Sequence, residues 1–292
     1  MALDGRLVRA IEKNLNDALT APDSVDGAMI AQTLTLPAAS YLIDLADEAD
    51  VDAIVTAREF ACQEIGKALK GLLLTVYKQN QETGDFSATQ DAVAKRALKN
   101  QALGYLVWSG DEAMLSLAQA QYDSANCMTD TSRAIQALMG SSAESARSLA
   151  AKDLVTFYNR WADEALVIDH WFAIQSMCDL PGALSRVESL MAHEAFTLTN
   201  PNRMRSVVMA FTENLRHFHA VDGSGYDFLA DRVIELNGIN PQMAARVLRP
   251  LTRWRKFGGE RRERMRSALE RILEVNDLSP DVFEIASKSV AD

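Results

Sequence analysis

The sequence predicts an all-α protein, and three observations support this fold class. Apolar residues recur with the 3.6-residue period of amphipathic helices, helix-start signals repeat along the chain, and no alternating run rich in Val, Ile or Thr predicts a strand. Helices with short connections favour antiparallel helix pairs stacked into a curved superhelix, an α-solenoid, although no exact repeat of the tetratricopeptide or ankyrin kind is present. We therefore expect a single helical superhelical domain over residues 1–292.

Two stretches show the helical period most clearly. Their apolar residues are spaced by three or four positions, which places them on one face of a helix and leaves the opposite face polar. The first stretch contains Leu154, Phe157, Tyr158, Trp161 and Ala165, and the second contains Tyr226, Leu229, Val233 and Leu236.

Polar residues mark the expected helix starts. A Ser followed three positions later by Gln or Glu is typical of a capping box, and Asn or Ser before Pro supplies an N-cap acceptor and a first helical residue with fixed φ. Asp222-Gly223-Ser224-Gly225 lacks the glycine spacing and the lysine of a phosphate-binding loop, so we expect a capping turn into a helix at Tyr226. The other start signals are Ser87 to Gln90, Ser109 to Glu112, Ser141 to Glu144, Asn200-Pro201, Asn240-Pro241 and Ser279-Pro280.

The composition favours part of a soluble, cytoplasmic protein. The longest apolar runs, such as residues 72–76, are far too short to span a membrane, and charged residues near the N-terminus argue against a signal peptide. Cys62, Cys127 and Cys178 lie far apart in the sequence and lack the spacing of a metal site, which favours reduced thiols.

Charge is uneven along the chain. The net charge is −10, but residues 201–292 contain 15 Lys and Arg against 13 Asp and Glu, so this last third is weakly basic. A basic segment raises the possibility of nucleic-acid binding, which the overall negative charge argues against. The run from Arg253 to Arg271 is interleaved with Glu260, Glu263 and Glu270, which favours a solvated helix face with ion pairs three or four positions apart.

Several blocks of the sequence, taken in order, resemble the C-terminal helical domain of bacterial aminopeptidase N, a zinc peptidase of the gluzincin class. The resemblance covers most of the chain and is weakest over about residues 1–56. It implies an all-helical superhelical domain whose catalytic partner domain is absent from this sequence. The blocks are residues 94–100, 125–130, 167–175, 200–206, 218–226 and 240–246.

The zinc motif of such enzymes is missing from this chain. The motif His-Glu-x-x-His places two ligands on one helical face around a Glu that activates water. His193-Glu194-Ala195-Phe196-Thr197 begins in the same way but has Thr at the second ligand position. We expect His170, His193, His217 and His219 to be hydrogen-bonded or surface histidines, and we expect neither a catalytic residue nor a metal ligand here.

Arginines are the candidate site residues. Arg203 and Arg205 lie in the first turns of the helix that opens at Pro201, where the helix dipole disfavours a cation. Structural ion pairs are one explanation for these arginines, and contact with an anion is the other. The resemblance implies that Arg205 and Arg246 line an internal cavity that faces the zinc domain and bind the carboxylate end of a peptide. Arg249 and Arg253 continue the row from Arg246 if the helix persists through Pro250.

The resemblance therefore implies a non-catalytic domain that encloses the active-site cavity of a zinc aminopeptidase and admits only short peptides. Its partners would be the catalytic domain of the same polypeptide, which would hold the zinc, and short peptides in the shared cavity. Neither nucleic acid nor membrane is expected as a partner. A free-standing helical-repeat scaffold for protein–protein interaction is the alternative, and an exposed apolar face would favour the separated domain over the scaffold.

Overall fold

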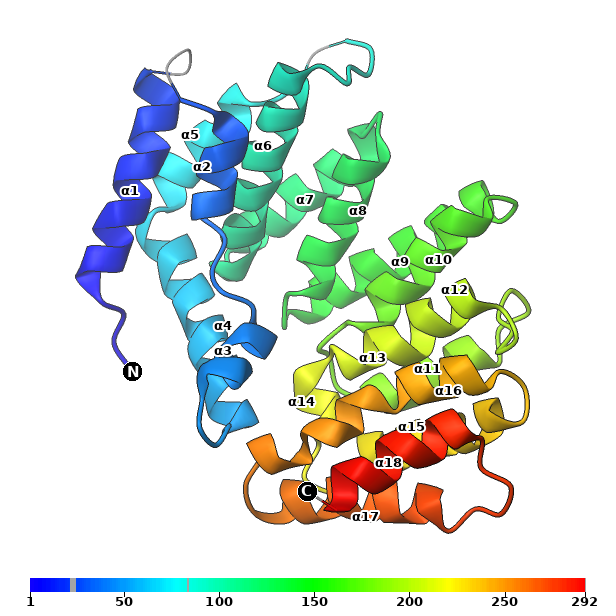
Figure 1. Cartoon of the computed structure of the whole chain (residues 1–292). Coiled ribbons are helices and arrows are strands. Elements are labelled where there is room, and N and C mark those ends of the chain that lie inside the picture. Colours follow the sequence, from blue (N-terminus) through cyan, green and yellow to red (C-terminus); the bar gives the residue numbers. More distant parts are fainter. Residues whose placement is uncertain (22–24, 83, 292) are drawn as a thin grey trace. The chain divides into compact units, whose positions relative to one another are not determined.

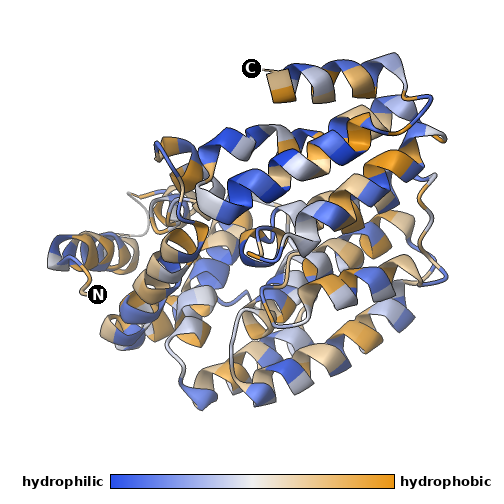
Figure 2. Cartoon of the chain, turned by 90° about the horizontal axis from the view of Figure 1, so that it is seen from below, coloured by the Kyte–Doolittle hydropathy of each residue, from blue (hydrophilic) through white to orange (hydrophobic). Residues whose placement is uncertain are grey.

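Helices dominate residues 1–21, 25–82 and 84–291, which the computed structural model describes (Figure 1). No strand occurs in these ranges, where one isolated parallel bridge joins Ala49 to Phe257. The all-α prediction is confirmed. Figure 2 shows hydrophobic and hydrophilic positions alternating along most helices, as expected for helices that bury one face. Within the same ranges, no helix is both long enough and apolar enough to cross a membrane.

The chain forms two compact units. Residues 1–37 and 56–157 make the first unit, and residues 38–55 and 158–292 make the second. A single domain over residues 1–292 stays a prediction, as does a superhelical curvature. The first unit contains α1 (Gly5–Thr20), α2 (Gly27–Thr33), α5 (Lys70–Gln79), α6 (Gln90–Trp108), α7 (Glu112–Ser124), α8 (Met128–Met139) and most of α4 (Val51–Ala68) and α9 (Glu144–Trp161).

The second unit contains α3 (Ala39–Leu45), the start of α4 and the last turn of α9, and it includes the helices that follow. Its segments α12, η1 and α13 follow one another without a break, so residues 201–212 form one helix whose middle turn is π-helical. The later segments are α10 (Ala165–Ser176), α11 (Ala183–Met191), α12 (Pro201–Met204), η1 (Arg205–Met209), α13 (Ala210–Thr212), α14 (Leu215–Phe218), α15 (Ser224–Asn237), α16 (Pro241–Val247), the 3₁₀ helix η2 (Arg249–Lys256), α17 (Gly259–Leu273) and α18 (Pro280–Ala291).

The Pro-containing start signals are confirmed. Asn200 is the N-cap of α12 and accepts from the N–H groups of Asn202 and Arg203. Asn240 accepts from Met243 N–H, and the Ser279 hydroxyl accepts from Val282 N–H. In each case the side-chain oxygen satisfies a backbone donor of the first helical turn.

The three predicted capping boxes are wrong in their register. The capping-box pattern placed Gln90, Glu112 and Glu144 three residues after the N-cap, inside the first turn. Helices α6, α7 and α9 instead begin at these residues. The N-caps of the first two are Thr89 and Asp111, whose side chains accept from backbone N–H groups of the first turn. In α6 and α7, a second polar residue closer to the helix therefore replaces the predicted Ser as the cap.

The capping turn before α15 is confirmed, although this helix begins at Ser224, two residues before the predicted Tyr226. Gly223 has φ +78°, a left-handed conformation that favours glycine, and Asp222 Oδ1 accepts from Ser224 N–H at 3.0 Å. A Cβ on Gly225 would overlap the carbonyl oxygen of Phe218, so the helix approaches the preceding chain closely. Tyr226, Leu229, Val233 and Leu236 are all fully buried, as their period predicted.

In the first unit, α6 packs against α2, α5, α7 and α8. A buried polar cluster joins three of these helices. Lys99 Nζ lies 2.5 Å from Asp130 Oδ2, and Asn100 Nδ2 donates to Asp130 Oδ1 at 2.6 Å. Gln121 Nε2 donates to Asn100 Oδ1 at 2.8 Å, so α7 is bonded to the same group. Two of the sequence blocks noted above, residues 94–100 and 125–130, therefore meet in the core.

The basic C-terminal run forms fewer local ion pairs than the sequence predicted. Arg266 and Glu270 are a pair four positions apart, at 3.0 Å. The other pairs join distant parts of the second unit, because acidic residues of the segment from α3 into α4 face the basic run. These pairs are Arg253–Asp44, Arg262–Glu48 and Arg261–Asp52, with Arg271–Asp231 between α17 and α15. The local-pair interpretation is thus wrong for most of these arginines.

Candidate functional site

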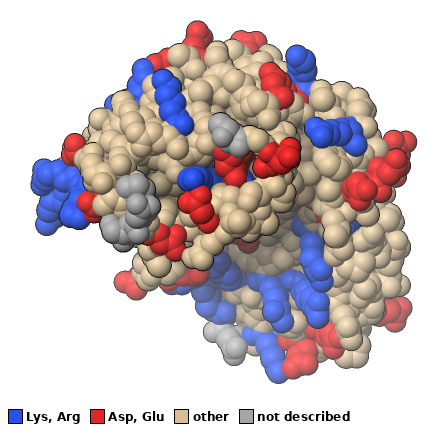
Figure 3. All heavy atoms as spheres, turned by 90° about the horizontal axis from the view of Figure 1, so that it is seen from above, with Lys and Arg blue, Asp and Glu red and all other residues tan. Residues whose placement is uncertain are grey.

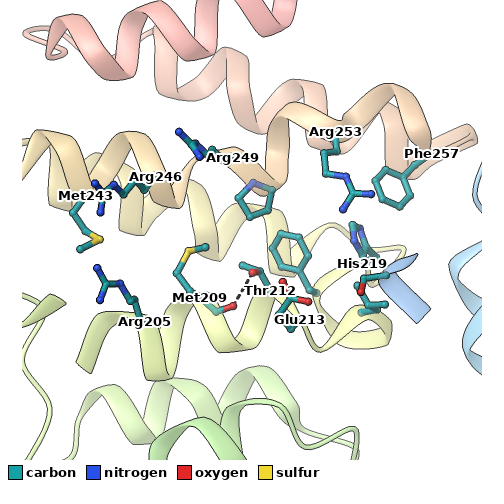
Figure 4. A pocket seen from close by; sticks show the side chains of 14 residues that line it. Arg205, Met209, Thr212, Glu213, His219, Met243, Arg246, Arg249, Arg253 and Phe257 are labelled. Atoms are coloured by element: carbon teal, nitrogen blue, oxygen red, sulfur yellow. Dashed lines mark hydrogen bonds between the residues drawn. The ribbon is translucent and has the colours of Figure 1, made fainter. Parts of the chain in front are cut away.

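Arg205 and Arg246 line the same cavity, which lies in the second unit and has a volume of about 500 Å³. The two arginines are 41 positions apart in the sequence and come from two separate helices. Figure 4 shows their side chains directed toward one another across one end of the cavity. Their predicted role as ligands of a peptide carboxylate stays a prediction.

Local structure accounts for the position of each arginine. Asn200 and Pro201 start the helix that carries Arg205, and its π-helical turn begins at Arg205 itself. A π turn inserts one residue into an α-helix and rotates the side chains that follow, and such turns are frequent at functional sites. Arg246 lies in the last turn of α16, where the helix dipole favours a cation.

The row of arginines does continue through Pro250, but on a 3₁₀ helix. Arg246, Arg249, Pro250 and Arg253 all line the cavity. In Figure 4 the guanidinium of Arg253 is directed toward His219, and that of Arg249 is directed away from the opposite helix. The lining is completed by Ser40, Met209, Thr212, Glu213, Leu215, Phe218, His219, Met243 and Phe257.

The two ends of the cavity differ in charge. The guanidinium of Arg246 has no hydrogen-bond or ion-pair partner within residues 1–21, 25–82 and 84–291, and Arg205 donates only to Asn202 Oδ1 at 3.2 Å. Arg253, by contrast, is paired with Asp44. Figure 3 shows a group of Lys and Arg side chains in the lower part of the surface, and side chains of both charges over the rest of that view. The end formed by Arg205 and Arg246 is thus the part of the cavity best suited to an anion.

Arg203 differs from Arg205 in burial and contacts, although the two lie in one helix. Arg203 is 9% exposed and forms an ion pair with Asp169. Its Nε donates to the Ala195 carbonyl at 2.8 Å, and its Nη1 donates to the Ala165 carbonyl at 2.9 Å. The structural explanation therefore holds for Arg203.

His219 is a buried wall of the cavity. Its Nδ1 lies 2.9 Å from the Tyr226 hydroxyl, and its ring stacks on Phe257 at 4.3 Å between centroids. Burial, together with the nearby guanidinium groups of Arg261 and Arg253, lowers the pKa of His219 to about 3. The imidazole is therefore neutral at physiological pH and adds no charge to the cavity.

The histidines of this chain do not fit a zinc site. His193 Nδ1 accepts from Ala195 N–H at 3.1 Å, and His217 Nε2 lies 3.2 Å from Asp179 Oδ1. His219 is bonded to Tyr226, so these rings serve different local contacts. No group of three or more His, Cys, Asp or Glu side chains converges within the described ranges in a way that could hold a metal ion.

Sequence reasoning missed several residues of the cavity. Glu213 and Met209 lie on the side of the helix that carries Arg205, and Met243 lies one turn before Arg246, so helical spacing could have found them. Ser40 could not have been found in this way, because it comes from α3, far away in the sequence.

Comparison with known proteins assigns this chain to a family. The family model described as "Domain of unknown function (DUF3458_C) ARM repeats" matches residues 1–291. The chain belongs to this family. Its description as ARM repeats agrees with the predicted stacking of helix pairs.

The relatives are bacterial aminopeptidases. The chain is 35% identical to aminopeptidase N of Escherichia coli over 277 residues, which cover 94% of this chain and 31% of that protein. It is 38% identical to aminopeptidase N of Haemophilus influenzae over 88% of this chain and 29% of that protein. The resemblance to aminopeptidase N is confirmed.

A solved structure of Legionella pneumophila aminopeptidase A in complex with aspartic acid is also similar. Its TM-score is 0.88 at 27% identity, over 99% of this chain and 34% of that one. The chain thus spans about a third of the length of the relatives that it matches.

Proposed function

We propose that this chain is the non-catalytic C-terminal helical domain of a cytoplasmic aminopeptidase of the N type. In the complete enzyme, it would pack on a catalytic domain of the same polypeptide, which holds the zinc. The two domains together would enclose the active-site cavity and admit only short peptides. The match to aminopeptidases over about a third of their length supports this assignment.

The observation that carries the proposal is the meeting of Arg205 and Arg246 in one cavity. We infer that both guanidinium groups bind the C-terminal carboxylate of a peptide whose N-terminus lies at the zinc. Both arginines are exposed in this chain, so solvent screens them. A covering domain would remove water, and a charge-assisted hydrogen bond would then stabilise the bound peptide by about 1.5–3 kcal/mol.

The kinetics of the full-length enzyme test this role. Replacing Arg246 with Ala should raise KM for tripeptides about tenfold or more, and should leave the hydrolysis of alanyl-p-nitroanilide nearly unchanged because this substrate has no distal carboxylate. Arg9→Ala, on the exposed face of α1, is a control with the same change in charge. Equal losses for both substrates, or no loss for either, would show that Arg246 does not bind the carboxylate.

The gene upstream of this segment separates the proposal from a free-standing scaffold. An open reading frame that continues upstream and encodes His-Glu-x-x-His would support a domain of a zinc peptidase. A start codon at the beginning of this segment, with no such frame, would favour the scaffold.

A further inference from the structure

The cavity has an unpaired carboxylate away from the end that holds Arg205 and Arg246. Glu213 directly follows the helix of residues 201–212 and lines the cavity. Its carboxylate has neither a hydrogen-bond nor an ion-pair partner in residues 1–21, 25–82 and 84–291. An acid that lines a cavity with four arginines and pairs with none of them is free to bind a cation from a ligand.

The spacing of the two charged ends matches a short peptide. Arg205 and Glu213 are eight positions apart on one helical segment, which corresponds to at most about 12 Å along the axis, because an α-helix rises 1.5 Å per residue and the π turn rises less. An extended chain spans about 3.3–3.6 Å per residue, so a peptide of about three residues bridges this distance between its ammonium and carboxylate groups.

The wall between these ends suits side chains of varied shape. Met209, Met243, Phe218 and Pro250 supply apolar surface, and methionine adapts readily to different partners. A volume of about 500 Å³ lies within the usual range of about 300–1,000 Å³ for cavities that bind small ligands.

No other cation of the cavity is placed to neutralise Glu213. Arg253 is paired with Asp44, and the guanidinium of Arg249 is directed away from the opposite helix in Figure 4. His219 is neutral at physiological pH, since burial lowers its pKa to about 3. The carboxylate of Glu213 is therefore available to an ammonium group.

We propose that this cavity is a complete binding site for a free short peptide in its zwitterionic form, with the carboxylate at Arg205 and Arg246 and the ammonium at Glu213. The carboxylate end rests on the function proposed above. The ammonium end goes beyond it, because both termini of the ligand then lie within this chain. A peptide shortened by an aminopeptidase keeps two free termini, so the released peptide belongs to this class of ligand.

Four forms of one tripeptide test the proposal on the chain as it is. Ala-Leu-Ala, its N-acetyl form, its C-terminal amide and the doubly blocked form would be titrated against protein carrying ¹³C-methyl methionine. The signals of Met209 and Met243 would report binding at the cavity. Each blocked terminus should weaken binding by about three- to tenfold, as expected for a lost charged contact at an exposed site.

Two variants assign the two ends. Glu213→Gln should abolish the discrimination against the N-acetyl form and keep that against the amide, and Arg246→Gln should do the reverse. Glu188→Gln on α11 and Arg9→Gln on α1 are exposed controls with matched changes in charge. Thermal unfolding of each variant would confirm that it is folded. The four peptide forms also test the proposal on the wild-type chain, so the test does not depend on any variant.

Each result decides between the two proposals. Loss of binding on amidation alone would overturn the zwitterion site and leave the carboxylate role intact. Loss on acetylation alone, or no binding of any form at about 20 mM peptide, which is 20 times a weak Kd of about 1 mM, would also overturn the zwitterion site. The carboxylate role would then rest on the kinetics of Arg246→Ala in the full-length enzyme, where the covering domain removes water. Discrimination against the N-acetyl form that survives in Glu213→Gln would show that Glu213 is not the ammonium site.

Discussion

Replacing Arg203 with Ala should destabilise the second unit strongly, while the same change at Arg205 should not. Arg203 is buried, is paired with Asp169, donates to two backbone carbonyls and lies over the Phe172 ring at 5.6 Å. Removing it would leave the Asp169 carboxylate, 17% exposed, without this partner. Breaking a buried ion pair on one side costs about 3–5 kcal/mol. Arg205 is exposed and donates only to Asn202, so its loss should change the free energy of unfolding by less than about 0.5 kcal/mol.

Urea unfolding of the two variants and the wild type, followed by circular dichroism, would measure these differences. A lower midpoint at unchanged slope would show a loss of stability rather than a change in the unfolded state. Arg203→Ala/Asp169→Ala should lose less than the sum of the two single changes, because the two groups interact. Equal costs for Arg203→Ala and Arg205→Ala would refute the division of these arginines into a structural and a binding residue.

Three further outcomes are expected. The chain alone should hydrolyse neither alanyl- nor arginyl-p-nitroanilide and should bind no stoichiometric zinc by mass spectrometry; metal-dependent turnover that co-purifies with the chain would contradict this. His219 should bind a proton at its ordinary pKa in the unfolded protein, but only near pH 3 in the folded protein. The free energy of unfolding should therefore decrease as the pH falls from the ordinary pKa of histidine to about 3, and it should decrease less steeply in His219→Phe. Gly225→Ala should destabilise the protein because its Cβ would overlap the Phe218 carbonyl, whereas Gly238→Ala, with open space around it, should not; similar melting temperatures would count against the close approach at Gly225.

Much of the helical architecture could be predicted because its signals are local. Asn200-Pro201 and Asn240-Pro241 specify a cap and a first helical residue in two adjacent positions, and both are confirmed. The boxes at Ser87 and Ser109 failed because Thr89 and Asp111 lie closer to the helix and compete for the same backbone donors. The sequence pattern alone cannot show which of two side-chain acceptors within one turn of each other will be the N-cap.

Long-range pairing could not be predicted in the same way. The glutamates that alternate with arginines in residues 253–271 suggested local pairs, yet Asp44, Glu48 and Asp52 supply most of the partners. These acids lie about 200 positions earlier, and only the fold brings them to the basic run. The basic run is therefore neutralised mainly by a second segment of the chain, and not by the glutamates of its own helix.

In the sequence, Arg203 and Arg205 are both cations near the start of a helix. In the structure, their side chains contact different groups. Arg203 lies two residues before the π turn and faces α10, where it pairs with Asp169 and donates to the Ala165 carbonyl, and it also donates to the Ala195 carbonyl. Arg205 lies on the cavity side opposite Arg246, and neither guanidinium pairs with a carboxylate among the residues that the structure describes. Two like charges held together without a counterion repel each other, and a ligand carboxylate between them would relieve that repulsion. Because Arg203 is buried and paired, it is not available to a ligand. The unpaired guanidinium groups of Arg205 and Arg246 are therefore the strongest structural reason to expect an anion in this cavity.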